Sequence, residues 1–281
     1  MNSRQVIIDA QLTWARAHGF APDRRGYVAR VEDNLFRPLS GGAKAAFDQG
    51  SGGELVDTPR SPAKMKALHS SSALAVNVFD YWFDQDAKPL VAALNLGVGI
   101  TRLAFEAQYP TGLAGNPPNL DVVLELVGGR QFAIESKFTE WMQPKARGKA
   151  PFKEKYFDSK LGLWAQFDLG GCQQLAVGMQ SGDIEFRYLD AAQLLKHALG
   201  LSTQLGRAVS LAYIYFDAPG AAGDAHTEEI ERFAAEIDDS LSFTAIRYQE
   251  LYSRLRQSAD DRHADYLAYL GQRYFSAAIG V

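Results

Sequence analysis

The sequence lacks several features that would define its class at once. It has a single cysteine, Cys172, which excludes an intramolecular disulfide and a zinc site built from cysteines. No apolar run is long enough to span a bilayer, and the first residues lack the basic start and apolar stretch of a secretory signal. The GxxxxGK[ST] pattern of phosphate-binding loops is also missing, which argues against a P-loop enzyme. We therefore expect a cytoplasmic protein without a membrane partner.

An excess of positive charge is missing as well. The chain carries 29 Lys and Arg against 33 Asp and Glu, a formal net charge of −4, which argues against a protein that coats nucleic acid generally. A nuclease stays possible, because it needs only a local basic face and its metal-binding carboxylates lower the net charge. With 47% hydrophobic residues in 281, the chain can bury a sizeable core. No linker or internal repeat divides it, so we expect one domain over residues 1–281.

The apolar pattern predicts alternating helices and strands. Residues 4–17 have helical periodicity, 19–62 read as long surface loops that order only on a partner, and 70–84 and 88–95 read as helices. Strands are expected at 101–109, 119–127 and 130–138, before a polar, basic insertion at 139–160. The remaining elements are a helix at 163–180, a strand at 184–188, a helix at 190–201, a strand at 207–217, a helix at 226–238, a strand at 242–248, and helices at 249–257 and 260–275. This order predicts an α/β fold with a mixed sheet.

Two charged residues share one face of the strand at 130–138. Alternation places Glu135 and Lys137 on the face opposite Phe132 and Ile134. A carboxylate and an ammonium in the middle of a sheet are expensive to bury unless each has a partner or a metal. Asp121 stands at the start of the neighbouring apolar strand, so we expect a polar site where these strands adjoin.

The hairpin between these strands decides whether Asp121 joins the pair. If Gly128 and Gly129 form a two-residue loop, Asp121 faces Ser136 and points to the wrong side of the sheet. A three-residue loop, or one bulge, moves its partner to Glu135 or Lys137 and unites all three. The sequence leaves both registers open.

Asp121 followed by Glu135-Ser136-Lys137 across a hairpin resembles the PD-(D/E)XK, or restriction-endonuclease-like, nuclease superfamily. The proline of the motif, Pro118, stands three residues before Asp121 rather than next to it. The segments GLAGNPPNLDVVLE and FAIESKFTE are similar to uncharacterised bacterial restriction endonucleases. The resemblance covers about 66–217 and implies a core of a helix, a three-strand antiparallel meander, a helix and a further strand. Residues 1–65 and 218–281 would then be helical elaborations.

What the resemblance implies for the site agrees with the chemistry of phosphodiester cleavage. Asp121 and Glu135 would hold Mg²⁺, for which Mn²⁺ substitutes, together with the Ser136 carbonyl, because a hard cation with oxygen ligands offsets the negative charge. Lys137 would orient the attacking water and stabilise the charge of the transition state. Glu106 is a candidate third carboxylate, and the alternative is a solvated glutamate of an edge strand.

Candidate nucleic-acid contacts lie in the basic insertion and on the helix after it. The insertion supplies Lys145, Arg147, Lys149, Lys153 and Lys155, which would contact a DNA backbone or simply be solvated. Related nucleases often place a glutamine such as Gln193 near the site, but Asp190 and Gln193 also fit a helix capping box, which we favour. The histidines at 69, 197, 226 and 263 lack metal-ligand spacing, and we assign them no site.

Three functions are compatible with this pattern. The leading one is a Mg²⁺-dependent DNA endonuclease of restriction or defence type, for which cutting of both strands would favour a homodimer. A structure-specific repair nuclease or an RNA nuclease of the same fold is the second. The third is a nuclease-like protein that binds nucleic acid or a protein partner without cutting, which retention of Asp121, Glu135 and Lys137 together disfavours.

Overall fold

A mixed five-stranded sheet forms the centre of the molecule in the order β1-β2-β3-β4-β5. The computed structural model describes residues 3–50, 53–146, 148, 150–158, 160–206 and 208–276. The strands are β1 (Ile100–Gln108), β2 (Asn119–Leu126), β3 (Gln131–Lys137), β4 (Val209–Tyr215) and β5 (Phe243–Arg247). β1, β2 and β3 are antiparallel to their neighbours in the meander, whereas β4 and β5 run parallel to β3. The expected α/β fold with a restriction-endonuclease-like core is confirmed.

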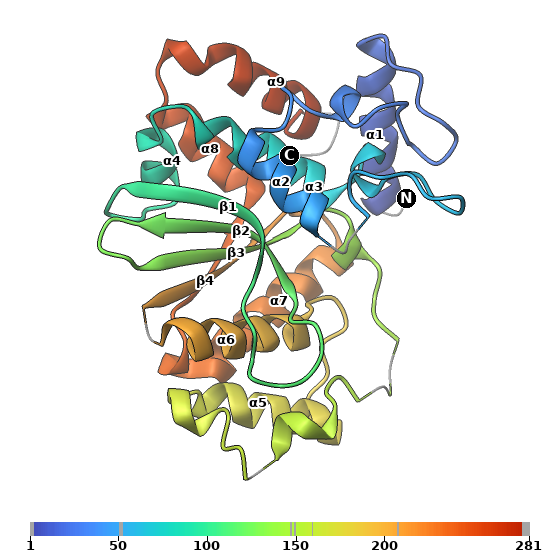
Figure 1. The fold of residues 1–281 in the computed structure, drawn as a ribbon. Coiled ribbons are helices and arrows are strands. Elements are labelled where there is room, and N and C mark those ends of the chain that lie inside the picture. Colours follow the sequence, from blue (N-terminus) through green and yellow to red (C-terminus); the bar gives the residue numbers. More distant parts are fainter. Residues whose placement is uncertain are drawn as a thin grey trace.

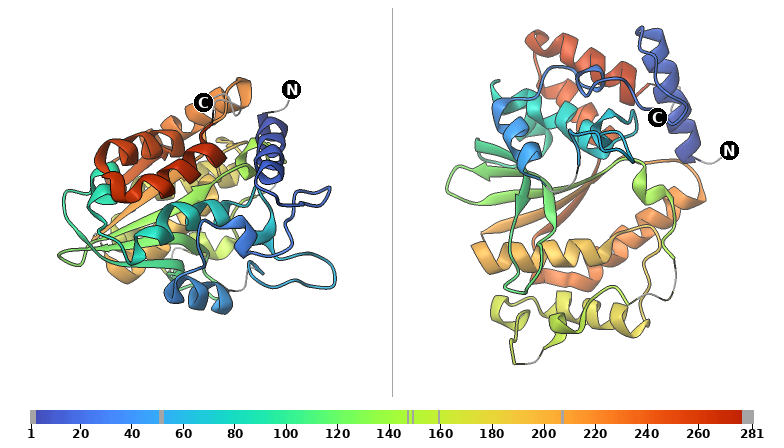
Figure 2. Two further views of the ribbon diagram at one scale, coloured as in Figure 1. Left: turned by 90° about the horizontal axis from the view of Figure 1, so that it is seen from above. Right: turned by 45° about the vertical axis from the view of Figure 1, so that its right-hand side comes forward.

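Helices cover both faces of this sheet (Figures 1 and 2). One layer holds α2 (Gly41–Gln49), α3 (Ser71–Phe79), α4 (Lys88–Ala93), α8 (Tyr248–Ser258) and α9 (Ala264–Tyr274), with α1 (Ser3–Ala17) beside it. The other holds α5 (Gly170–Ser181), α6 (Ala191–Leu205) and α7 (Ala221–Ile237). Short 3-10 helices lie at Glu32–Asn34, Lys64–Lys66, Asp80–Phe83, Glu140–Met142, Glu154–Phe157, Ala165–Phe167, Asp238–Ser240 and Asp261–His263. No helix in these described ranges is long and apolar enough to cross a membrane.

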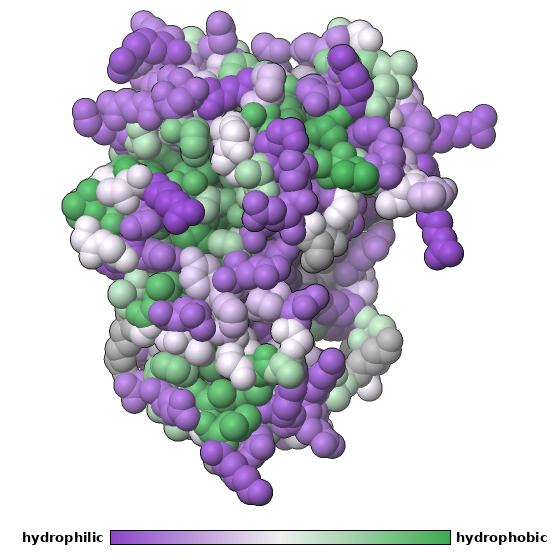
Figure 3. All heavy atoms as spheres, in the orientation of Figure 1, coloured by the Kyte–Doolittle hydropathy of each residue, from purple (hydrophilic) through white to green (hydrophobic). Residues whose placement is uncertain are grey.

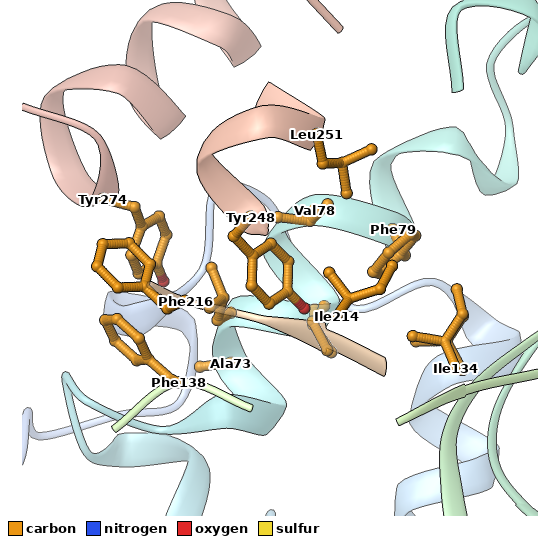
Figure 4. Close-up of a cluster of buried hydrophobic side chains, with 14 of the residues drawn as sticks. Ala73, Val78, Phe79, Ile134, Phe138, Ile214, Phe216, Tyr248, Leu251 and Tyr274 are labelled. Carbon is orange, nitrogen blue, oxygen red and sulfur yellow. The ribbon is translucent and has the colours of Figure 1, made fainter. Parts of the chain in front are cut away.

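Strand alternation divides the interior into two cores. Phe132 and Ile134 face the layer of α3, α8 and α9, where Phe138, Phe216 and Tyr274 pack together as Figure 4 shows. Ala133 faces the layer of α5, α6 and α7 instead. Because both faces are covered, β4 is largely apolar and almost wholly buried. Glu135 and Lys137 belong by alternation to the second face, so a charged pair sits under α6.

The outer surface carries little of this apolar material. Figure 3 shows a face that is mainly hydrophilic, with apolar side chains gathered in separate patches. The large apolar side chains that the described residues expose come from well-separated positions of the chain: Val56, Phe83, Val98, Val127, Leu161 and Val177. Exposed apolar residues spread in this way are usual for a globular protein.

Residues 19–62 were expected to be loops, and that prediction is wrong for Gly41–Gln49, which form α2. Ser40 begins α2 because its hydroxyl accepts a hydrogen bond, 3.1 Å long, from the backbone N–H of Ala43. The Ser-Gly-Gly sequence is therefore a helix start rather than a turn. α2 buries Phe47, whose ring lies 5.7 Å from that of Phe105 on β1. α2 therefore forms part of the helical layer that covers the sheet.

The strand expected at 184–188 is also absent from the sheet. The backbone N–H groups of Arg187, Tyr188 and Leu189 donate to the carboxylate of Glu229 on α7, at 2.7, 2.8 and 2.8 Å. A side chain therefore satisfies donors that a strand would pair with another strand. The helix expected at 163–180 begins only at Gly170, because Asp168 adopts a left-handed conformation at φ 57°.

A buried arginine ties the first and last helices together. Arg273 on α9 is 1% exposed and donates to the backbone oxygen of Asn34 at 2.7 Å and to the side-chain oxygen of Gln11 at 3.3 Å. Gln11 on α1 returns a hydrogen bond of 2.7 Å to the backbone oxygen of Arg273. The segments on either side of the predicted core therefore pack on each other.

Gly200 offers a test of how α6 packs on the sheet. A Cβ there would lie 2.2 Å from the backbone oxygen of Tyr109, so Gly200→Ala forces the helix away from the end of β1. We expect this variant to lose about 1–3 kcal/mol of unfolding free energy, although alanine ordinarily favours a helix interior. Gly170→Ala on α5, where a Cβ meets nothing within 4 Å, is the control and should not destabilise. Urea denaturation measures both, and equal stability of the two variants would contradict the packing.

Candidate active site

The β2–β3 hairpin has the register that brings Asp121 to Glu135. Its loop is Val127-Gly128-Gly129, closed by a hydrogen bond of 2.8 Å from the N–H of Leu126 to the oxygen of Arg130. Both glycines have positive φ, 92° and 82°, which side chains rarely tolerate. Val122 pairs with Ile134, and continuing this register by one residue sets Asp121 opposite Glu135. Opposed residues share a face, so the three-residue alternative is the one that occurs.

The β2–β3 ladder opens beside this pair. Regular backbone pairing between β2 and β3 ends at Val122 and Ile134. The N–H of Ser136 donates instead to Oδ2 of Asp121 at 2.6 Å. In a strand the N–H and C=O of one residue point the same way, so the Ser136 carbonyl also points towards β2. On the other face, the Ser136 hydroxyl lies 2.6 Å from the Tyr248 hydroxyl of α8. Ser136 is thereby held from both sides of the sheet.

Glu135 is a buried carboxylate, 1% exposed, with a nitrogen-bearing side chain beside each oxygen. The ammonium of Lys137 hydrogen-bonds to Oε1, and Nε2 of His197 lies 2.9 Å from Oε2. The latter two atoms are close enough for an ion pair, yet their orientation makes no regular hydrogen bond and neither has another partner in the described structure. Burial alone would raise the pKa of Glu135, but Lys137 and His197 outweigh it and lower that pKa to about 2.

Asp121 experiences the opposite balance. Burial, followed by repulsion from Glu135, raises the pKa of Asp121 well above its ordinary value, and Lys137 and the Ser136 N–H oppose this only in part. For Lys137, burial would lower the pKa, but Glu135 and Asp121 raise it above its usual range. The site therefore favours the protonated ammonium of Lys137 and the ionised carboxylate of Glu135. The ionised form of Asp121 is disfavoured, because the positive charge near it does not offset its burial and the repulsion from Glu135.

Helix α6 supplies two further side chains. Asp190 caps the helix by accepting from the N–H of Gln193 at 3.1 Å, as expected. The Gln193 side chain does not complete a capping box, because its oxygen accepts from the Lys137 ammonium at 3.3 Å. His197 stands one turn later on the same face and reaches Glu135.

His197 was assigned no site from sequence, and the structure corrects this. It is 2% exposed and lies against the buried carboxylate of Glu135. The available signal was its spacing of four residues from Gln193, which puts both side chains on one helix face. Metal-ligand spacing was the wrong criterion, because His197 contacts a carboxylate.

Glu106 lies next to the site on β1. Its neighbours Phe105 and Ala107 pair with Val122 and Leu120, so Glu106 stands opposite Asp121. Its backbone has φ 51°, a left-handed value that is strained for a non-glycine residue in a strand. Asn119 donates to its carboxylate at 2.6 Å. Burial, and to a lesser degree Glu54 and Glu135, raise the pKa of Glu106 against the effect of Asn119. Glu106 therefore interacts electrostatically with Glu135 in the site.

The basic insertion places its lysines differently from one another. The Lys145 ammonium lies 2.8 Å from the Asp190 carboxylate and donates to the oxygen of Leu189, so this side chain is engaged in the fold. Lys155 donates to the backbone oxygen of Ala114, and Lys153 is exposed. Arg147 and Lys149 lie outside the described residues.

The donor set is that of a hard cation. The described residues include no group of three or more His, Cys, Asp and Glu arranged to hold a metal. Asp121, Glu135 and the Ser136 carbonyl instead provide two carboxylates and a backbone oxygen, and Mg²⁺ characteristically takes one or two carboxylates and keeps several waters. Oε2 of Glu135, buried without a regular hydrogen bond, is consistent with this. The residues fit such an ion.

The fold and this cluster together define a restriction-endonuclease-like protein. The family model described as "Restriction Endonuclease associating with ARP" matches residues 18–275, and the chain belongs to this family. The match extends beyond 66–217 and includes most of both flanking segments. No curated protein and no solved structure matches the chain.

Asp121→Asn tests the charge imbalance of the site. The folded state raises the pKa of Asp121 above its unfolded value, so ionisation of this carboxyl destabilises the fold as pH rises through the raised pKa. The amide removes that charge and can still accept from Ser136. In EDTA at pH 8 we expect the variant to melt roughly 2–4 °C higher, the shift that about 1 kcal/mol produces in a protein of this size. The difference should shrink towards pH 4.

Thermal melts of wild type, Asp121→Asn and Glu125→Gln across this pH range provide the measurement. Glu125 lies farther along the same face of β2, and its variant should keep the wild-type profile. A lower melting temperature for Asp121→Asn at pH 8 would show that the carboxylate stabilises the metal-free fold.

Proposed function

We propose that this protein is a Mg²⁺-dependent nuclease that hydrolyses phosphodiester bonds in DNA, with a restriction or defence role in the cytoplasm. The observation that carries the proposal is the register of the β2–β3 hairpin, which sets Asp121 opposite Glu135 with Lys137 on the same face. Membership of a restriction endonuclease family supports it. The fold alone would not, because one fold hosts many functions.

Asp121, Glu135 and the Ser136 carbonyl would hold the metal, and Glu106 is the additional carboxylate within its electrostatic reach. When bound, Mg²⁺ (or Mn²⁺ in its place) supplies Lewis-acid stabilisation for the charge that develops on the phosphate. The two carboxylates would make binding of a cation at this place favourable. Asp121 in particular carries a raised pKa, which nearby positive charge would relieve.

Lys137 acts as an orienting and electrostatic group. Its raised pKa keeps the ammonium protonated, so it donates hydrogen bonds and does not remove protons. Gln193 accepts one of these bonds at 3.3 Å and fixes the direction of the ammonium across the site. A positioned cation of this kind stabilises negative charge in the transition state.

His197 is a positioning residue. It lies against Oε2 of Glu135 and helps to fix the orientation of a carboxylate that would bind metal. Groups behind a metal ligand commonly set its geometry and affinity.

Several partners follow from this assignment. Lys153 and Lys155 of the insertion would contact the DNA backbone. Lys145 is paired with Asp190 and would act on DNA mainly through long-range electrostatic attraction. Cutting both strands with one site per chain would favour a homodimer. The description of the family also makes ARP a candidate partner.

Substitution of the three site residues tests catalysis. Asp121→Asn, Glu135→Gln and Lys137→Ala should each lower the rate of DNA cleavage by at least about 100-fold, because each removes a group acting on the metal or the transition state. Cleavage of plasmid and linear DNA with Mg²⁺ or Mn²⁺ is the assay, and EDTA should abolish it.

Glu125→Gln serves as the matched control, since it removes a carboxylate from the same strand away from the site. It should cleave like the wild type. Equal cleavage by wild type and all three site variants would exclude this site as the source of activity.

His197→Asn tests the positioning role without relying on cleavage. We expect Mn²⁺ affinity, measured by titration calorimetry or electron paramagnetic resonance, to fall by about 10–100-fold, as is common for groups behind a metal ligand. His226→Asn alters a buried histidine that contacts Tyr213 rather than Glu135 and should bind Mn²⁺ normally. Unchanged affinity in His197→Asn would show that Glu135 needs no support from α6.

A further inference from the structure

A concave, cationic cavity lies beside the candidate active site. It encloses about 440 Å³ between the β1–β2 loop and the basic insertion. Sites that enclose a small molecule typically have about 300–1,000 Å³. The cavity is therefore large enough for one nucleotide unit.

Charge in the cavity is of one sign. Its lining includes Lys153, Lys155 and Lys196, and none of the described residues that line it is Asp or Glu. Lys196 donates to the backbone oxygen of Pro151 at 3.1 Å, and Lys155 donates to that of Ala114. Each ammonium has three donors, so both can still bind an anion.

The crowding of these cations is evident at Lys196. Burial is the main factor that lowers its pKa, and the nearby Lys145 and Lys153 add to this effect while Asp190 opposes it. A phosphate in the cavity would relieve this repulsion, because it places negative charge among the ammonium groups.

Aromatic rings line the same cavity. The ammonium of Lys196 lies 5.2 Å from the ring centre of Phe152 and 6.0 Å from that of Tyr156. Phe152 is buried, whereas Tyr156 is half-buried and partly accessible. Proteins that hold unpaired strands combine a cationic groove with aromatic rings on which bases stack.

Two elements connect the cavity to the site. Lys196 stands on α6 between Gln193 and His197, which face Lys137 and Glu135. Pro118, also in the lining, precedes Asp121 by three residues, which is about 10 Å along an extended chain. A strand bound at Asp121 thus has the cavity close by.

We infer that this cavity binds one unpaired nucleotide of the DNA strand that enters the site, with its phosphate among Lys153, Lys155 and Lys196 and its base against Tyr156. The inference rests on the proposed nuclease function and names its substrate class: DNA with an unpaired nucleotide, such as a single strand, a flap or a frayed end. A duplex does not fit, because its bases are paired and stacked inside the helix and none is free to lie against Tyr156.

Binding in EDTA tests the cavity separately from cleavage. Fluorescence anisotropy compares a short single-stranded oligonucleotide with the matching duplex, for wild type, Tyr156→Leu and the double variant Lys155→Gln/Lys196→Gln. The lysine variant should bind the single strand at least about tenfold more weakly, and its salt dependence should flatten by about 0.7 per lysine. Tyr156→Leu should weaken it about fivefold or more through lost stacking.

Lys160→Gln is the matched control, because Lys160 is an exposed lysine of the same insertion outside the cavity. It should bind like the wild type, and duplex binding should change less than twofold in the Tyr156 variant. Melting temperatures confirm that each variant is folded.

Three results would overturn the inference: no binding of the single strand by wild type, equal losses for single strand and duplex, or unchanged binding in both cavity variants. A free deoxynucleoside monophosphate that binds as tightly as the oligonucleotide would also overturn it, since the cavity would then be a small-molecule site. If the protein never cleaves DNA but the expected binding pattern is found, the cavity assignment stands and the nuclease proposal fails.

Discussion

The buried negative charge of Glu135 is the constraint on which the arrangement of the molecule depends. The residue lies in β3 between two other strands and beneath a helix, with 1% of its surface exposed. A carboxylate in such a place is tolerated only when charge is supplied nearby. Lys137 supplies that charge from the same strand, and His197 of α6 lies 2.9 Å from the other carboxylate oxygen, so the helix must sit directly over this point of the sheet. The close approach at Gly200 is one way in which α6 reaches that position.

Much of this was predictable from the sequence, and the failures have identifiable causes. Alternation alone put Glu135 and Lys137 on one face, because side-chain direction in a strand is a local property. The register of Asp121 was not predictable, since it depends on how the two glycines at 128 and 129 turn, and both loop lengths are open to them. The helix at Gly41–Gln49 was misread as loop because Ser-Gly-Gly both begins helices and forms turns.

His197 shows a different limit. The helix face that it shares with Gln193 can be read from a spacing of four residues, but the strand which that face meets is set by tertiary packing. The same is true of Glu229, whose carboxylate takes three backbone donors that sequence patterns assign to a strand. Side chains that satisfy backbone groups from a distant helix leave no local signature.

The hydroxyl pair of Ser136 and Tyr248 has a consequence for how much of the chain the hairpin needs to keep its structure. Tyr248 begins α8, far along the chain from the hairpin, yet it is one hydrogen bond from Ser136 and two from Asp121. Transplanting only 66–217 into another scaffold would leave the Ser136 hydroxyl buried without its partner, which is costly in an apolar environment. Helix α8 therefore supports the hairpin through Tyr248, and an engineered minimal version of this protein would have to retain that helix.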